Sequence, residues 1–114
     1  MPHLVIHCSD GVLNIKKAED IIQLVHDSAE STDLFDKGDI KVRIQSFTHY
    51  NIGNSQDNFI HVFGNIMEGR TDVQKRMLSH KIVSAIKNSL NEVPIISMNI
   101  REFEKATYCN RGMV

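Results

Sequence analysis

Six histidines are the first candidates for chemistry in this sequence, because imidazole binds metals and transfers protons near neutral pH. His3 and His7 lie four residues apart in a segment patterned as a strand, which separates them by roughly 13 Å, too far for one ion. His26, His61 and His80 belong to separate predicted elements, and no carboxylate stands at a metal-motif spacing. We therefore expect no metal.

The cysteines and the first two residues offer other chemistry. Cys8 and Cys109 form no C-x-x-C pair, so we interpret both as reduced, structural thiols. Met1 is followed by Pro2, a start from which the methionine is removable, leaving a free secondary amine. At neutral pH an unperturbed amine of this kind is mostly protonated and cannot accept a proton.

Composition and charge limit the partners. The 114 residues, 1–114, form a single predicted domain, with a hydrophobic fraction of 41% typical of a globular core. A net charge of -1 offers no footprint for nucleic acid or an anionic membrane, so any anionic ligand must be held locally. No apolar stretch reaches the roughly 18 to 20 residues of a membrane span, and a cytoplasmic location is expected.

The first half of the chain predicts a strand, a helix and a strand. Residues 3–8 are apolar and β-branched and end at the turn Ser9-Asp10-Gly11. From Asn14, a predicted N-cap, apolar residues recur at helical spacing to Ala29. Residues 40–47 then alternate, so that Lys41 and Arg43 share one face of a strand.

The second half repeats this order. Residues 59–67 predict a strand, residues 72–90 a helix capped by Thr71, and residues 94–103 a fourth strand. The predicted fold class is therefore α/β (α+β), with two βαβ units in one four-stranded sheet and both helices on one face. The other face would expose a large apolar area, which predicts a homo-oligomer.

The opening segment Met1-Pro2-His3-Leu4-Val5-Ile6-His7-Cys8-Ser9-Asp10 resembles the start of 5-carboxymethyl-2-hydroxymuconate isomerases in the tautomerase superfamily. The stretches Gly38–Arg43, Phe59–Val62 and Gly69-Arg70 also fall where that family has them. The resemblance implies a cytoplasmic homotrimer whose sheets face inward around a barrel-like core. It also implies a cofactor-independent isomerase of aromatic-compound catabolism whose small anionic substrate is an unsaturated hydroxy or oxo polycarboxylic acid of the 5-carboxymethyl-2-hydroxymuconate type.

The resemblance assigns a role to each candidate residue. It implies that Pro2, freed of Met1, is the catalytic base, and burial beside a cation would lower the pKa of its nitrogen toward neutral pH. Arg70 stands where relatives have an arginine that braces the substrate through paired hydrogen bonds. Lys41 occupies the position of a second family arginine, so either this lysine or Arg43 supplies the second cation.

Two other interpretations of the function remain open at this point. A related proline-dependent activity, such as arylpyruvate tautomerisation or semialdehyde decarboxylation, would use the same residues. A non-catalytic, tautomerase-like oligomeric binding protein would keep the fold without the reaction. Phe47 and Tyr50, near the end of the second strand, are candidates for contact with a neighbouring subunit's site.

Overall fold

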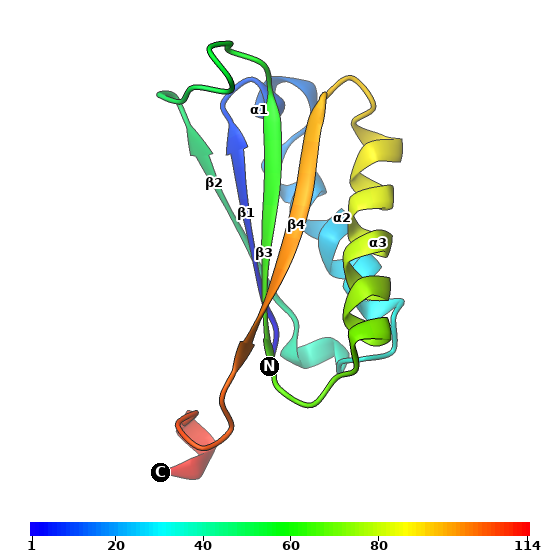
Figure 1. Cartoon of the computed structure of the whole chain (residues 1–114), viewed down its shortest axis with the longest axis vertical. Helices are drawn as coiled ribbons and strands as arrows, with labels where there is room; N and C mark the ends of the chain where they lie inside the picture. The colour runs from blue at the N-terminus through cyan, green and yellow to red at the C-terminus, as the bar shows by residue number, and fades with distance from the viewer.

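A computed structural model describes all residues, 1–114, as one four-stranded sheet with helices packed on one side (Figure 1). The strands are β1 (His3–Ser9), β2 (Lys41–Phe47), β3 (Phe59–Met67) and β4 (Ile95–Phe103). The helices are α1 (Val12–Ile15), α2 (Ala18–Glu30) and α3 (Asp72–Ser89), with short 3-10 turns η1 (Lys37–Asp39) and η2 (Arg111–Met113). No helix is long and apolar enough to cross a membrane.

The strand order β2-β1-β3-β4 confirms the two-unit architecture. β1 pairs with β2 in parallel and β3 pairs with β4 in parallel, while β1 and β3 run antiparallel at the centre. The register places His3 opposite Lys41 on one side and opposite Asn65 on the other. The starts of β1 and β2 and the end of β3 therefore meet at one end of the sheet.

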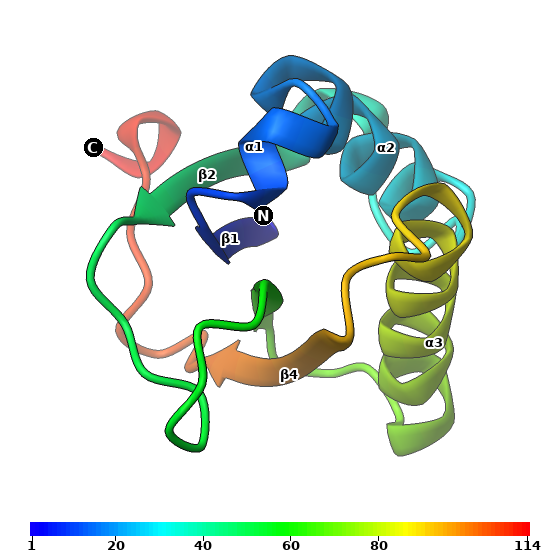
Figure 2. The same cartoon turned by 90° about the horizontal axis from the view of Figure 1, so that it is seen from above.

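The core lies between the sheet and the helices. Strand positions that face the helices are fully buried, including Leu4, Ile6, Ile60 and Val62. Figure 2 shows α2 and α3 together on one side of the sheet, with the other side free of helices. This arrangement confirms that both predicted helices cover the same face.

The first predicted helix differs from the observed one. The chain forms the single turn α1 and then the separate helix α2, because Lys16 adopts an extended conformation between them. Asn14 lies inside α1 and is not an N-cap, and Lys17 begins α2 without a side-chain cap. The apolar periodicity from Ile15 onward continues across this break, which is why the spacing predicted one helix.

Helix α3 begins at the predicted cap and buries one apolar stripe. Thr71 forms a capping box with Gln74: the Thr71 hydroxyl accepts from the Gln74 amide, and the Gln74 side chain accepts from the Thr71 amide. The buried residues are Leu78, Ile82 and Ile86, one turn apart. Val73, in the first turn of α3, is 69% exposed and lies outside this buried stripe.

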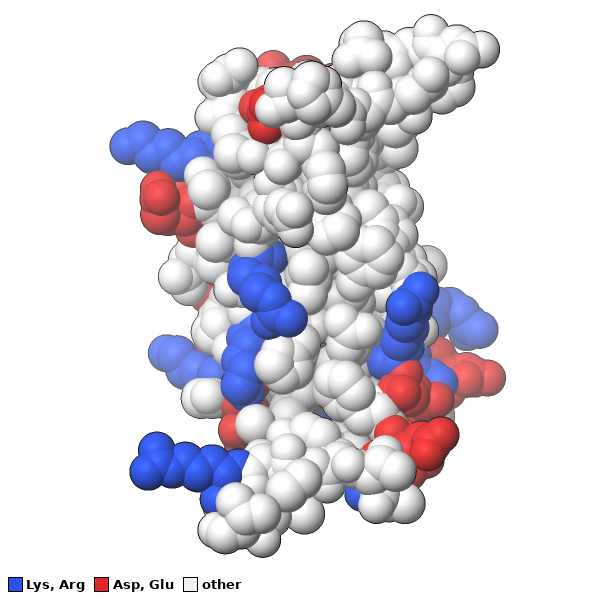
Figure 3. Space-filling view, turned by 90° about the vertical axis from the view of Figure 1, so that its left-hand side faces the viewer, with Lys and Arg blue, Asp and Glu red and all other residues white.

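The helix-free face of the sheet is more polar than the sequence led us to expect. None of the large exposed hydrophobic side chains lies on it, and its aromatic rings pack among imidazoles instead. The His7 ring lies 4.9 Å from both Phe47 and Phe63, and His61 hydrogen-bonds Ser97 (2.7 Å) and Asn99 (2.6 Å). Figure 3 shows that uncharged atoms cover most of this side, with separate Lys and Arg side chains between them.

Candidate active site

A cavity of about 190 Å³ opens beside the first residue of the chain. It lies at the end of the sheet where β1 and β2 begin and where the turn after β3 leads into α3. Its lining comes from three separate segments and consists of Met1, Asp33, Leu34, Phe35, Asp36, Asp39 and Arg70. A water molecule takes up about 30 Å³ in the liquid, so this space suits a small organic molecule.

Pro2 lies directly behind Met1 and is buried. Its carbonyl oxygen accepts a hydrogen bond from the Lys41 amide at 3.1 Å, which holds the residue against the start of β2. The Pro2 nitrogen is bonded to the Met1 carbonyl carbon, and Met1 itself lines the cavity. Loss of Met1 would therefore turn a free Pro2 nitrogen toward the space that Met1 occupies.

The surroundings of the amino terminus disfavour its protonated form. Burial is the largest cause and lowers the pKa of the Met1 amine from the ordinary 8.0. The nearby cations Lys41 and Arg70 lower this pKa further, whereas Asp39 and Asp36 act in the opposite direction. The net shift is toward a neutral amine, the form that can accept a proton.

Arg70 shares the cavity with the amino terminus. It follows Gly69, whose φ of 119° turns the chain sharply between β3 and α3 in a conformation that side chains rarely allow. The Arg70 guanidinium donates a hydrogen bond to the Leu34 carbonyl oxygen and lies 5.2 Å from the centre of the Phe35 ring. Arg70 is only partly buried, so it can still turn donors toward a bound carboxylate.

Lys41 and Arg43 lie at different distances from this cavity. The Lys41 ammonium donates to the Asp39 carbonyl oxygen at 2.8 Å and lies 3.7 Å from the Met1 sulfur, beside the amino terminus. Arg43 lies two residues further along β2, where its guanidinium is 3.1 Å from the His3 Nδ1 atom, and it does not line the cavity. The structure brings Lys41, not Arg43, next to Pro2.

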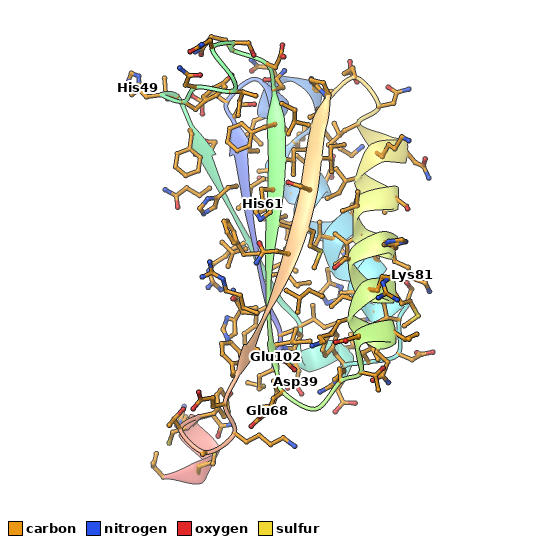
Figure 4. The ribbon with its side chains drawn as sticks, viewed as in Figure 1. Asp39, His49, His61, Glu68, Lys81 and Glu102 are labelled. Carbon is orange, nitrogen blue, oxygen red and sulfur yellow. The ribbon has the colours of Figure 1, made fainter.

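The sequence reasoning missed the loop between α2 and β2. We assigned it no role in the site from the sequence, yet Leu34 and Phe35 hold Arg70, and Asp33, Asp36 and Asp39 line the cavity. The one available signal was the spacing of three between these aspartates. Figure 4 shows Asp39 at the end of the sheet where the chain begins.

Other chemistry-bearing side chains lie elsewhere. Figure 4 places His61 in the middle of the sheet, and no three His, Cys, Asp or Glu side chains gather in a geometry that could hold a metal ion. Phe47 and Tyr50 pack with Phe59 near the loop that leads into β3, at the opposite end from the amino terminus. They do not contribute to the cavity of the same chain.

A larger and more open depression of about 610 Å³ runs between α3 and β4. Arg76, His80 and Lys87 line it, together with serines and the edge of β4. The smaller cavity, which combines an amino terminus of lowered pKa with an arginine, is therefore the stronger candidate for catalysis.

Comparison with known proteins points to one family. The sequence model described as 5-carboxymethyl-2-hydroxymuconate isomerase matches residues 2–113. A search of curated protein sequences finds no match.

Three solved structures share the fold. A 5-carboxymethyl-2-hydroxymuconate isomerase from Deinococcus radiodurans R1 superposes with a TM-score of 0.83 at 20% identity, covering 96% of this chain and 88% of the other. Pt0534 inactivated by 2-oxo-3-pentynoate superposes with a TM-score of 0.82 at 16% identity, covering 98% of this chain and 94% of the other. A fused 4-OT symmetric trimer superposes with a TM-score of 0.80 at 16% identity, also covering 98% of this chain and 94% of the other.

Proposed function

The chain belongs to the 5-carboxymethyl-2-hydroxymuconate isomerase family, and we propose that it is a cofactor-independent isomerase that moves a proton within a small unsaturated hydroxy or oxo polycarboxylic acid, with the Pro2 nitrogen as the base. One observation carries the proposal. The Met1 amine, whose pKa is lowered by burial, and Arg70 border the same cavity, and loss of Met1 would expose the Pro2 nitrogen to that cavity. An acid-base group and an anion-binding group are thus side by side.

The reaction needs only one proton-transfer group. The neutral Pro2 nitrogen takes a proton from the enol oxygen or an acidic carbon of the substrate and becomes a secondary ammonium. The electron pair left behind shifts along the conjugated chain, and the ammonium returns its proton to a different carbon. The substrate is isomerised and the nitrogen is neutral again, and this sequence of steps requires no oxidant and no metal.

Cations stabilise the charge that develops in this step. As the proton leaves, negative charge grows on the substrate oxygens, and Arg70 can donate two parallel hydrogen bonds to a carboxylate. Lys41 lies beside the amino terminus and supplies a point charge that also favours the neutral amine. Arg43, on the helix-free face next to His3, contributes to substrate binding only across an interface between subunits.

The uncovered face of the sheet supports a homotrimer. One sheet face lacks a helical cover and presents aromatic rings among hydrogen-bonded polar groups. The fused 4-OT neighbour, which shares the fold, is a symmetric trimer. We propose that three copies of this chain associate through their sheet faces, which would cover the aromatic rings.

Substitution of Pro2 tests the catalytic proposal. Pro2→Ala also permits methionine removal but leaves a primary amine on a smaller, less fixed residue. Because a positioned acid-base group contributes about 10²–10⁴-fold, kcat/KM for a 2-hydroxydienoic acid should fall at least about a hundredfold. Mass spectrometry must confirm that Met1 is absent from both proteins, and light scattering must show the same mass, near three chains, for each.

The pH dependence gives a second readout. In the unmodified enzyme, kcat/KM should rise as the amine loses its proton, with a midpoint below the usual pKa of a free amino terminus. Full activity in protein that retains Met1 would show that the Pro2 nitrogen is not the base, and full activity in the Pro2→Ala variant would show that the proline ring is not needed.

Covalent labelling distinguishes protein in which the Pro2 nitrogen is free from protein in which Met1 is still bonded to it. In 2-oxo-3-pentynoate the alkyne is conjugated to a carbonyl, so a neutral secondary amine can add to it. A nitrogen–carbon bond forms, one π bond of the alkyne is lost, and the amine proton moves to the neighbouring carbon. Protein without Met1 should gain the full mass of the reagent at Pro2, and in protein with Met1 peptide mapping should find no reagent on Pro2, whose nitrogen is then an amide.

A further inference from the structure

The two long helices carry opposite charge. Helix α2 contains four acidic residues and no lysine or arginine; the acids are Glu19, Asp20, Asp27 and Glu30. Helix α3 contains one acidic residue, Asp72, and four basic ones, which are Lys75, Arg76, Lys81 and Lys87. The helical side of the molecule therefore combines an acidic helix with a basic one.

Two of the bases on α3 border the depression of about 610 Å³ between α3 and β4, which we call the α3–β4 groove. Arg76 and Lys87 are exposed at its rim, and neither belongs to an ion pair of the chain. Apolar side chains contribute to its floor, namely Val83 of α3 and Ile96 and Met98 of the edge strand β4. An apolar centre inside a charged rim is typical of a surface that a protein partner covers.

Two acids of α2 lie on the flank that is turned away from α3. Ser28 of α2 lines the hollow shared with α3 of the same chain. A helix turns by about 100° per residue, so Glu19 and Glu30 point in nearly the opposite direction from Ser28. Neither glutamate is ion-paired within the chain. Because α2 packs beside β2 and α3 beside β4, this acidic flank lies at the β2 edge of the molecule.

A ring of three copies brings the two charged surfaces together. In such a ring, with the sheets facing inward, every contact is head-to-tail, so the β4 edge of one copy meets the β2 edge of the next. The acidic flank of α2 then faces the α3–β4 groove of its neighbour. Strands β1 and β3 run antiparallel, so the helices that follow them also run in opposite directions, and rotation about the ring axis keeps this arrangement.

The spacing of the charges matches along the two helices. Glu19 and Glu30 are eleven residues apart, and so are Arg76 and Lys87. At 1.5 Å per residue each pair spans roughly 16 Å, or about three turns, so both members of a pair lie on one flank. With the helices antiparallel, Glu30 of one copy comes opposite Arg76 of the next, and Glu19 comes opposite Lys87.

We infer that the α3–β4 groove binds helix α2 of a second copy, with ion pairs Glu30–Arg76 and Glu19–Lys87 between the copies. The inference rests on the trimer of the proposed function and names the side chains that align it. Ile22, half-buried one turn after Glu19, would lie on the apolar floor. A contact between two β2 edges would instead oppose acid with acid, so the charges favour the head-to-tail ring.

Charge reversal at one pair tests the contact. Arg76→Glu and Glu30→Arg should each weaken one contact by about three- to tenfold at low ionic strength, because attraction is replaced by repulsion. A ring has three such contacts, so the overall association constant should fall by about thirty- to a thousandfold. Sedimentation equilibrium measures this constant, and added salt should reduce the difference from the unmodified protein.

The double reversal shows whether the residues meet. Arg76→Glu combined with Glu30→Arg should restore association, since these residues lie on opposite flanks of one chain and can pair only between copies. Lys81→Glu is the matched control: it makes the same charge change on α3, but on the flank facing α2 of its own chain, where Lys81 donates to the Ser31 carbonyl at 3.2 Å. It should leave association nearly unchanged.

A second pair makes the test independent of one variant. Lys87→Glu should weaken association as Arg76→Glu does, and addition of Glu19→Lys should restore it. Urea denaturation of each variant verifies that its subunits fold, which separates a lost contact from a lost fold.

The outcomes distinguish the inference from the proposed function. Unchanged association in the single reversals, or no recovery in the double ones, would overturn the inference and leave the isomerase and its trimer standing. Unchanged association together with loss of inorganic phosphate binding in Arg76→Glu would overturn it by assigning the groove to a small anion. A monomeric unmodified protein would refute the proposed trimer and the inference with it, whereas turnover by protein without Met1 tests the proposed reaction separately.

Discussion

Arg70 is the residue at which a structural and a catalytic role can be separated most clearly. Its guanidinium ties the turn after β3 to the loop between α2 and β2, through the Leu34 carbonyl and the Phe35 ring. The same guanidinium faces the cavity beside the amino terminus. We therefore predict that Arg70→Ala damages both stability and activity, but by very different amounts.

The expected loss of stability is small. A hydrogen bond from a charged donor contributes about 1.5–3 kcal/mol when well buried, and partial exposure of Arg70 reduces this to about 1 kcal/mol. Contact with an aromatic ring adds about 0.5–1 kcal/mol at such a site. Arg70→Ala should therefore lower the free energy of unfolding by about 1–2 kcal/mol, measured by urea denaturation at fixed protein concentration.

The expected loss of activity is larger. Removal of one group that stabilises developing oxyanion charge costs about 10²–10³-fold in rate, or about 2.7–4 kcal/mol. Arg70→Ala should lower kcat/KM by that factor, followed as the loss of dienol absorbance under conditions where the protein stays folded. Arg70→Lys keeps the charge without the planar fork and should recover only part of the activity.

Phe35→Leu is the matched control. It removes the ring beneath the guanidinium but leaves Arg70 in place, so it should lower stability by about 0.5–1 kcal/mol and change kcat/KM only severalfold. If Arg70→Ala lost stability as expected but kept kcat/KM within a few-fold of the unmodified enzyme, Arg70 would be an anchor for the loop. Its assignment as a substrate-binding residue would then be refuted.

The remaining predictions concern a thiol and a histidine. Burial and the nearby Asp10 raise the pKa of Cys8 to about 11, so at pH 8 a thiol reagent should label exposed Cys109 in the native protein and Cys8 only after unfolding; rapid labelling of both would contradict this. Burial, followed by Arg43, lowers the pKa of His3 below 6.5, so the unfolded chain binds this proton more readily and stability should decline as pH falls below 6.5. The free energy of unfolding, measured by urea denaturation from pH 5 to 8, should decline less steeply with falling pH in His3→Gln than in the unmodified protein. The same pH dependence in both proteins would exclude His3 as the cause.

The regular elements were largely predictable because their signals are local. Alternation of apolar residues, helical spacing and the capping residue Thr71 depend on neighbours in sequence, and they located four strands and the second helix correctly. The break at Lys16 was not predictable from spacing, because the apolar positions continue in phase on both sides of it. The polarity of the helix-free face was also misjudged, since it depends on which side of each strand faces the helices.

The sequence by itself determined the fold class and the family resemblance, and that resemblance predicted that an arginine after Gly69 would serve Pro2. Only the tertiary structure decided what surrounds them. Parallel pairing of β1 with β2 places the loop before β2 beside the amino terminus, and Arg70 contacts Leu34, 36 residues away in sequence. The charge of the cavity is a sum over side chains from distant segments, so no local pattern could reveal that three aspartates border it beside Arg70.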